Sequence, residues 1–129
     1  MLTNKNLLAV GLLTLALVGC VSTTLTNLTP TTQPRNATGQ YLIEYVWESN
    51  QQTLRPETIT PYVIVGFDSY QMRRVLRMTN RWETYVPVPA SQDSLRYYFK
   101  VDYEYNQFGS KPGVASFKSP EYKLVIQDK

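Results

Sequence analysis

The chain lacks histidine entirely and has a single cysteine among its 129 residues. Without imidazole, neither a Ser-His-Asp triad nor a histidine-ligated metal site can form. One cysteine excludes an internal disulfide and a zinc site built from several thiolates. The sequence has no glycine-rich phosphate-binding loop, and its carboxylates are too scattered for a calcium loop. We therefore expect a protein that is not an enzyme and that uses no metal or cofactor.

Neither sign of charge is in large excess. Lys plus Arg number 13 and Asp plus Glu number 10, which leaves a formal net charge of +3. This excess is too small to indicate a nucleic-acid partner. The apolar run from Leu7 to Val18 is shorter than the ~20 residues that a membrane-spanning helix needs. It has the length of the apolar region of a secretory signal.

The apolar run ends at Leu17-Val18-Gly19-Cys20 and follows a short polar start with Lys5. This arrangement resembles the signal of the bacterial lipoprotein family, in which Leu, a small or medium residue and then Gly or Ala precede an invariant Cys. The resemblance implies cleavage between Gly19 and Cys20 and acylation of Cys20 with chains such as palmitate. Two or three acyl chains hold a protein firmly on a membrane.

Val21 follows the cysteine. In Gram-negative members of the lipoprotein family, an Asp at this position tends to retain the protein in the inner membrane. Val21 therefore favours the outer membrane over the inner membrane. We expect a protein of the cell envelope that is anchored to the membrane through lipidated Cys20, with an envelope protein or a glycan as partner and no nucleic acid.

The chain divides into three segments of different composition. Residues 1–19 form the expected signal peptide. Residues 20–38 are rich in Thr and Pro and have few large apolar side chains, which predicts a short disordered tether. Alternatively, Leu25 and Leu28 add a first edge strand to the domain. Residues 39–129 are expected to form one β domain.

Aromatic and β-branched residues alternate with polar residues from Gly39 onward, and this period of two predicts strands. The expected strands are 41–48, 62–67, 70–78, 81–88, 95–105, 114–117 and 122–126. Residues 70–78 also fit a helical spacing, but the short turn before them favours a strand. Pro87 and Pro89 lack an amide donor, so their strand should lie at a sheet edge or end there.

Six or seven short strands without a convincing helix predict a single Ig-like β-sandwich. The cysteine pair of antibody domains is absent, so this expectation rests on architecture alone. The order of three segments resembles the strand order of glycogen-binding, early-set β-sandwich modules. These segments are Arg81-Trp82, Val86-Pro87-Val88-Pro89 and residues 97–102. That resemblance implies sugar binding. The sequence departs from the pattern where Tyr103-Glu104-Tyr105 continues the strand in place of an Asp-Gly or Asn-Gly turn.

The sequence has sixteen aromatic residues: 10 Tyr, 4 Phe and 2 Trp. Most are expected in the core, including Trp82 on the inward face of its strand. The alternation likewise predicts Val101 inward and Asp102 outward on the longest strand. Tyr85 and Tyr98 fall on otherwise polar faces of consecutive strands. Because consecutive strands commonly pair, both rings are expected on one outer face. Exposed tyrosines near charged groups suit sugar or protein binding. The alternative is cross-strand aromatic packing.

Arg73, Arg74, Arg77 and Arg81 form a local basic patch, in which Arg73, Arg77 and Arg81 are the candidate contacts for an anionic glycan, a lipid headgroup or peptidoglycan. The alternative is that these arginines pair with Glu83, Asp102 and Glu104 across the sheet. The leading expectation is thus a lipid-anchored envelope protein with a non-catalytic structural or protein-interaction sandwich. The second is a carbohydrate-binding module on the same anchor.

Overall fold

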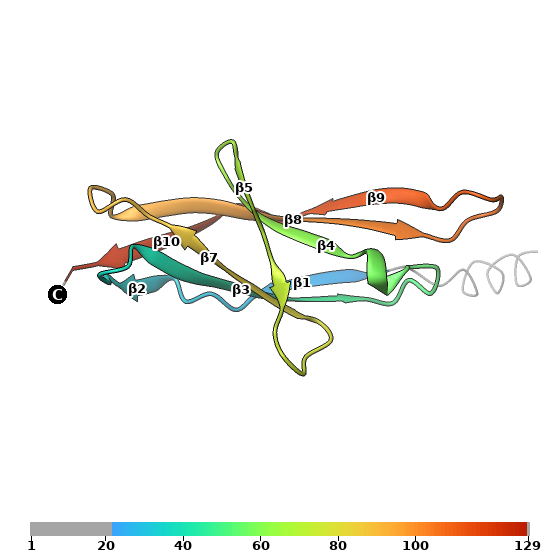
Figure 1. Cartoon of the computed structure of the whole chain (residues 1–129), viewed down its shortest axis with the longest axis horizontal. Helices are drawn as coiled ribbons and strands as arrows, with labels where there is room; N and C mark the ends of the chain where they lie inside the picture. The colour runs from blue at the N-terminus through green and yellow to red at the C-terminus, as the bar shows by residue number, and fades with distance from the viewer. Residues whose placement is uncertain (1–21, 129) are drawn as a thin grey trace, which may run out of the picture.

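The computed structural model describes residues 22–128, which form ten strands and one turn of 3₁₀ helix (Figure 1). The expected signal peptide and its cleavage and acylation site, Gly19 and Cys20, lie outside these residues. Within residues 22–128, no helix has the length and apolarity needed to span a membrane.

The strands form two sheets. The first sheet has the order β1 (Thr23–Asn27), β3 (Gln40–Ser49), β7 (Arg81–Pro87) and β6 (Arg73–Arg74). The second has the order β2 (Thr32–Pro34), β10 (Tyr122–Gln127), β8 (Ser94–Tyr105), β4 (Thr60–Val65) and β5 (Asp68–Gln71). In the second sheet β9 (Gly113–Lys118) also pairs with β8, and a 3₁₀ turn, η1 (Pro56–Thr58), precedes β4. All pairs are antiparallel except β2 with β10, which run parallel.

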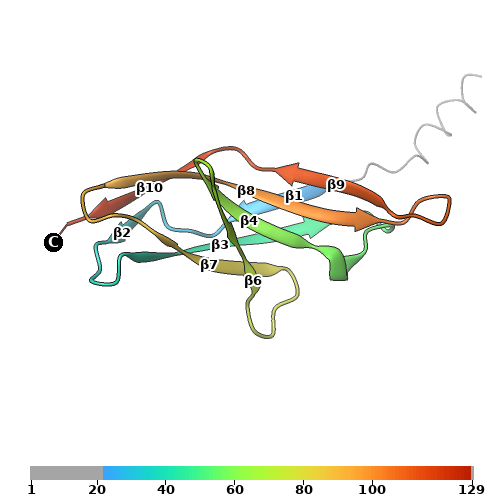
Figure 2. The same cartoon turned by 45° about the horizontal axis from the view of Figure 1, so that its top comes forward.

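This strand order is that of an Ig-like sandwich. In the usual lettering one sheet holds strands A, B, E and D and the other holds C, F and G. Here β1, β3, β7 and β6 occupy the first set, while β4, β8 and β10 occupy the second and β5 extends it. The expected all-β, Ig-like sandwich is confirmed. Figure 2 shows the two sheets running along the length of the molecule.

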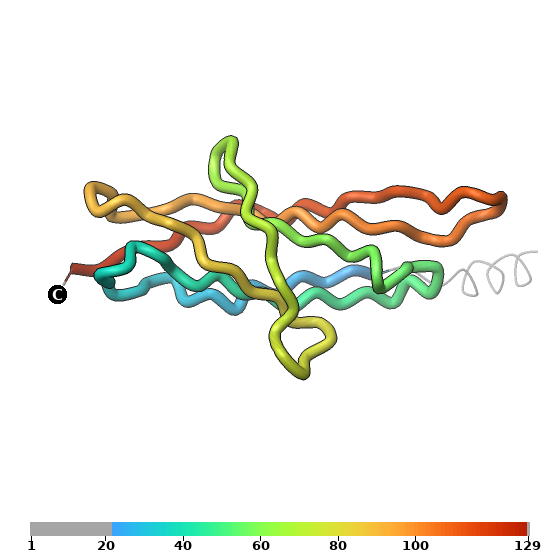
Figure 3. The backbone as a smooth tube through the Cα atoms, viewed as in Figure 1, coloured from blue at the N-terminus to red at the C-terminus, as the bar shows by residue number. Residues whose placement is uncertain are grey.

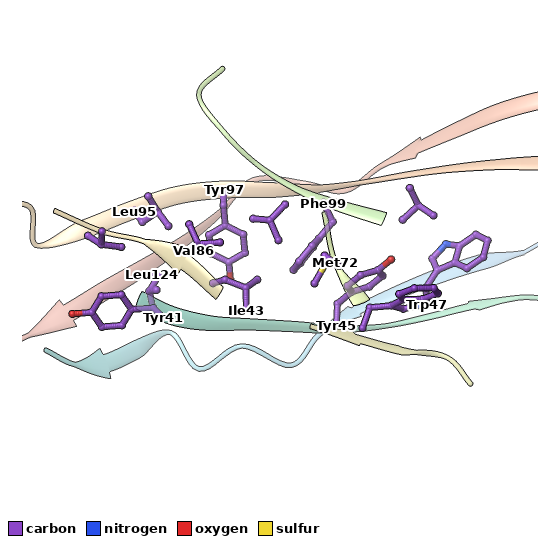
Figure 4. Close-up of a cluster of buried hydrophobic side chains, with 14 of the residues drawn as sticks. Tyr41, Ile43, Tyr45, Trp47, Met72, Val86, Leu95, Tyr97, Phe99 and Leu124 are labelled. Carbon is purple, nitrogen blue, oxygen red and sulfur yellow. The ribbon is translucent and has the colours of Figure 1, made fainter. Parts of the chain in front are cut away.

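The core lies between the sheets and is rich in aromatic residues (Figure 4). The Tyr45 ring of β3 and the Phe99 ring of β8 lie 4.7 Å apart, measured between centroids. They join the same two strands, B and F, that the disulfide links in antibody domains. Val101 is fully buried and Asp102 is not, as the alternation predicts. Aromatic packing therefore bridges the sheets where a disulfide is absent.

The expectation of a disordered tether over residues 20–38 is wrong for the residues that the structure describes. β1 pairs with β3, and β2 pairs with β10, so this segment contributes to both sheets. Leu25 packs against the core. The Thr29 hydroxyl donates to the Glu44 carbonyl and accepts from the Glu44 amide, which extends the ladder beyond β1. Threonine is β-branched, and a Thr-rich segment can form strands once neighbouring edges offer backbone partners.

Two other expectations are corrected. The expected strand 70–78 is interrupted, because β5 ends at Gln71 and β6 covers only Arg73–Arg74. The expected strand 62–67 ends at Val65, and Gly66 with Phe67 forms the turn to β5. Gly66 has a φ of 58°, which suits the first position of a tight hairpin turn.

Of the two alternatives for this strand, the second is confirmed, because β7 ends at Pro87, whereas β6 is the last strand of the sheet. β6 pairs with only two residues of β7, so the stretch toward Pro87 lies open on that side. Figure 3 shows the chain between β5 and β7 crossing from one sheet to the other along this edge.

Candidate functional site

The two tyrosines singled out from the sequence lie on opposite faces of the sandwich, so the expectation of one shared face is wrong. Tyr85 belongs to β7 of the first sheet and Tyr98 to β8 of the second. β7 and β8 are consecutive but do not pair, because the chain crosses between sheets there. Tyr85 is 52% exposed and lies opposite Leu42. The sequence therefore predicted the outward direction of each ring but not the sheet.

The arginines are largely engaged within the first sheet. Arg81 binds the Glu44 carboxylate of β3 through two nitrogens, with Nε 2.9 Å from Oε2. Arg73 forms an ion pair with Glu83, 3.8 Å away on β7. Arg77 lies in the β6–β7 loop with a φ of 66°. The alternative of pairing with carboxylates on neighbouring strands thus holds for Arg73 and Arg81. Arg73 pairs with Glu83 as expected, whereas Arg81 pairs with Glu44, which was not among the expected carboxylates.

Tyr98 lies in a hollow of about 450 Å³ on the outer face of the second sheet. The hollow is lined by Tyr62, Ile64, Ser69, Tyr98, Lys100, Asp102 and Lys118. Ile64 lies directly opposite Tyr98, and Tyr62 lies opposite Lys100. The Asp102 carboxylate accepts from Ser116 Oγ at 2.5 Å and lies 3.6 Å from Lys100 Nζ. The hollow therefore combines two tyrosine side chains with charged and hydrogen-bonding side chains.

A second hollow, of about 480 Å³, opens at the edge of the sandwich, and we call it the edge groove. Its apolar lining comes from both sheets and comprises Val65, Tyr70, Pro87, Val88, Pro89 and Leu95. Thr38, Gly39, Gln40, Asp68 and Gln92 complete the lining. The groove lies beside β5, the last strand of its sheet, whose outer side has no strand partner among the described residues. The edge groove thus joins an apolar surface to a free strand edge.

Phe67 stands at the tip of the β4–β5 hairpin, between the two strands that flank the edge groove. Its side chain is 108% exposed, and Leu76 in the β6–β7 loop is 90% exposed. Sequence reasoning missed Phe67 because it completes a continuous apolar run that is typical of a buried strand. The preceding Gly66 is the signal that could have placed Phe67 in a turn.

The buried polar atoms of the core are a third feature. Tyr45 Oη and Trp47 Nε1 have no hydrogen-bond partner among the described residues. Burial raises the pKa of the Tyr45 hydroxyl above its ordinary value. In contrast, Tyr97 Oη accepts from Asn27 Nδ2 at 2.8 Å. Trp82, which the sequence places inward, is buried, and the Arg74 guanidinium lies 4.8 Å from its ring centroid.

Within residues 22–128, no group of three or more Cys, Asp or Glu side chains is placed to hold a metal ion. Ion pairs in this part of the chain instead connect separate segments of the fold. Arg35, for example, binds Asp93 and Asp128 and so ties the segment after β2 to the C-terminal end of the domain.

Comparison with protein-family models gives no match. No curated protein matches the sequence. Among solved structures, the chain is similar to the structure of murine CRIg, with a TM-score of 0.43 and 10% sequence identity. The alignment covers 84% of this chain and 98% of that chain.

Proposed function

We propose that this chain is a lipid-anchored protein of the bacterial cell envelope whose non-catalytic β-sandwich binds another protein. The observation that carries the proposal is the edge groove, which places an apolar lining beside the free edge of β5. A partner segment in extended conformation would add a strand to β5 through main-chain hydrogen bonds. Its apolar side chains would enter the groove, and Phe67 would contact the partner beyond the end of the strand.

The anchor in this proposal is Cys20, and the supporting feature is the motif Leu17-Val18-Gly19-Cys20. Val21 supports the outer membrane as the destination in a Gram-negative cell. The test is replacement of Cys20 with Ser, which should leave the precursor unacylated and move it from the detergent phase to the aqueous phase. Val21→Ile keeps the cysteine and should remain in the detergent phase. Equal partition of Cys20→Ser and the unchanged protein would contradict the anchor.

The partner surface is tested by comparing two exposed apolar positions on different faces. Phe67→Ser should abolish co-purification of a stoichiometric partner from detergent-solubilised envelopes. Tyr85→Ser, on the outer face of the other sheet, should retain that partner. Both variants should unfold thermally at the temperature of the unchanged protein, because both side chains are exposed. A partner that is retained by Phe67→Ser would contradict the edge groove as its binding site.

A second candidate function is sugar binding, and it is favoured by the hollow around Tyr62 and Tyr98. A tyrosine ring can stack on the apolar side of a sugar ring while neighbouring charged groups bind the hydroxyls. Tyr98→Ala should then abolish retention on envelope polysaccharide without changing the thermal unfolding temperature. Tyr85→Ala should leave retention unchanged, because Tyr85 lies on the opposite face. Destabilisation by Tyr98→Ala without a specific loss of retention would make this ring a packing residue.

A further inference from the structure

The β8–β9 hairpin ends in an exposed loop, residues 106–112, that combines an aromatic side chain with a cation. Phe108 is 107% exposed near the tip of the loop, and Lys111 follows it. Val114, at the start of β9, is exposed as well. The sequence from Tyr105 to Pro120 contains no Asp or Glu. An exposed Phe beside a Lys, without a carboxylate in the same stretch, suits the interface of an anionic membrane.

Glu104, on β8 of this hairpin, and Glu57 are both engaged with the Arg55 cation. Arg55 Nη1 lies 3.3 Å from Glu104 Oε2, and Arg55 Nε lies 3.2 Å from Glu57 Oε1. Their negative charge is therefore partly neutralised locally and opposes an anionic surface less strongly.

The hairpin lies at the same end of the molecule as the start of the described fold. Ser22 N–H donates to Asn50 Oδ1 at 2.6 Å, and Asn50 N–H donates to the Ser22 carbonyl at 3.1 Å. The loop after Asn50 then joins the hairpin, because Asn106 N–H donates to the Thr53 carbonyl at 2.7 Å. Leu54 also forms a β-bridge with Tyr105. In Figures 1 and 2, this hairpin forms one end of the long axis and the C-terminus lies at the other.

Only one residue separates Cys20 from Ser22 in the sequence. Two residues of chain span at most about 7 Å, so acyl chains on Cys20 would bring Ser22 close to the bilayer surface. A domain on a long tether could take any orientation, whereas one fixed at Ser22 presents this end to the lipid. In Figure 1, the β8–β9 loop projects beyond the loop to which Ser22 is bound. Phe108 belongs to this β8–β9 loop.

We propose that the β8–β9 tip is a second membrane contact, in which Phe108 enters the interface and Lys111 binds anionic headgroups. The sandwich then stands on the bilayer by its end and holds the edge groove away from the lipid. This inference rests on the proposed lipid anchor at Cys20.

The experiment uses the full-length acylated protein in vesicles of phosphatidylethanolamine and phosphatidylglycerol. Because acylation consumes the thiol of Cys20, Phe108→Cys supplies the one free thiol for an environment-sensitive fluorophore. Phe67→Cys is the matched control, since both positions are hairpin tips and both side chains are fully exposed. We expect severalfold stronger quenching by nitroxide-labelled lipid at position 108 than at position 67, and a blue-shifted emission at position 108 only.

The outcomes separate this inference from the anchor itself. Protein that floats with the vesicles but shows equal, weak quenching at both positions would overturn the membrane contact and leave the anchor standing. Protein that does not float would overturn the anchor and the contact with it. A fluorophore at position 108 that is shielded only after addition of envelope proteins would assign the tip to a protein partner and overturn the proposal. Lys111→Glu should weaken quenching at position 108 while flotation is retained.

Discussion

At the centre of the sandwich, Tyr45 buries a hydroxyl that has no hydrogen-bond partner among the described residues. Removing such a group costs nothing in lost hydrogen bonds and relieves its desolvation. We expect Tyr45→Phe to leave the free energy of unfolding unchanged or to raise it by up to about 1 kcal/mol. Tyr97→Phe should lower it by about 1 kcal/mol, because Asn27 Nδ2 would lose its acceptor. Urea unfolding of both variants checks the contrast, and equal losses would contradict it.

The neighbouring residues Val101 and Asp102 test the alternation of β8. Val101 is fully buried, whereas Asp102 lies on the outer face with Ser116 and Lys100. Val101→Asp would bury an unpaired carboxylate, so we expect a loss of more than about 4 kcal/mol and an unfolded domain. Asp102→Ala should change stability by less than about 1 kcal/mol, because its ion pair is half-exposed. Circular dichroism with thermal unfolding distinguishes the two, and similar effects would mean that the register is wrong.

Among the elements, the β8–β9 hairpin depends on a glycine for the packing of an aromatic ring. Gly113 pairs with Tyr105 across the two strands. A Cβ at Gly113 would lie 2.2 Å from Cζ of the Tyr105 ring, too close for any contact. Gly113→Ala must displace that ring, and overpacking of this kind typically costs about 1–3 kcal/mol.

The check is a double-mutant cycle with Tyr105→Ala. If the ring is the obstacle, Gly113→Ala should cost much less in the Tyr105→Ala background than in the unchanged protein. An equal cost in both backgrounds would place the strain in the backbone.

The alternation of side chains along a strand is a local property, so the sequence alone predicts which face of its strand a residue occupies. It predicted the inward faces of Trp82 and Val101 and the outward face of Tyr98, all of which depend on a period of two. It could not predict which sheet a strand joins, because that depends on partners distant in sequence. β7 and β8 illustrate this limit, since they are consecutive yet lie in different sheets. The hollow beside Tyr98 and the edge groove were missed for the same reason.

The prediction of disorder from the composition of residues 20–38 is wrong for a related reason. A Thr- and Pro-rich segment buries little surface by itself, so its composition favours disorder. In the structure, the free edges of β3 and β10 supply the hydrogen-bond partners that the segment cannot supply alone. The alternative that Leu25 belongs to an edge strand is confirmed. Leu28 lies just beyond the end of that strand, where its amide donates to the Glu44 carbonyl.

For the whole molecule, the N-terminal segment closes the sandwich. β1 borders the first sheet and β2 borders the second, so one segment covers an edge of each. Arg35 then binds Asp93 and Asp128, which joins the segment to the β7–β8 connection and to the C-terminal end. The fold unit is therefore longer than the domain 39–129 that composition predicts, and it begins only three residues after Cys20.

Truncation tests this boundary. A chain that begins at Gly39 should lose more than about 3 kcal/mol of stability relative to a chain that begins at Ser22, or fail to fold. The loss combines the partial burial of Leu25, worth up to about 1.5 kcal/mol, with several hydrogen bonds of about 1 kcal/mol each. The shorter chain also exposes the edges of β3 and β10 and should aggregate more readily. Urea unfolding and light scattering check both effects. If the chain from Gly39 matched the longer chain in stability and solubility, β1 and β2 would be accessories to a complete domain, and Ser22 would no longer fix the orientation of the sandwich on the membrane.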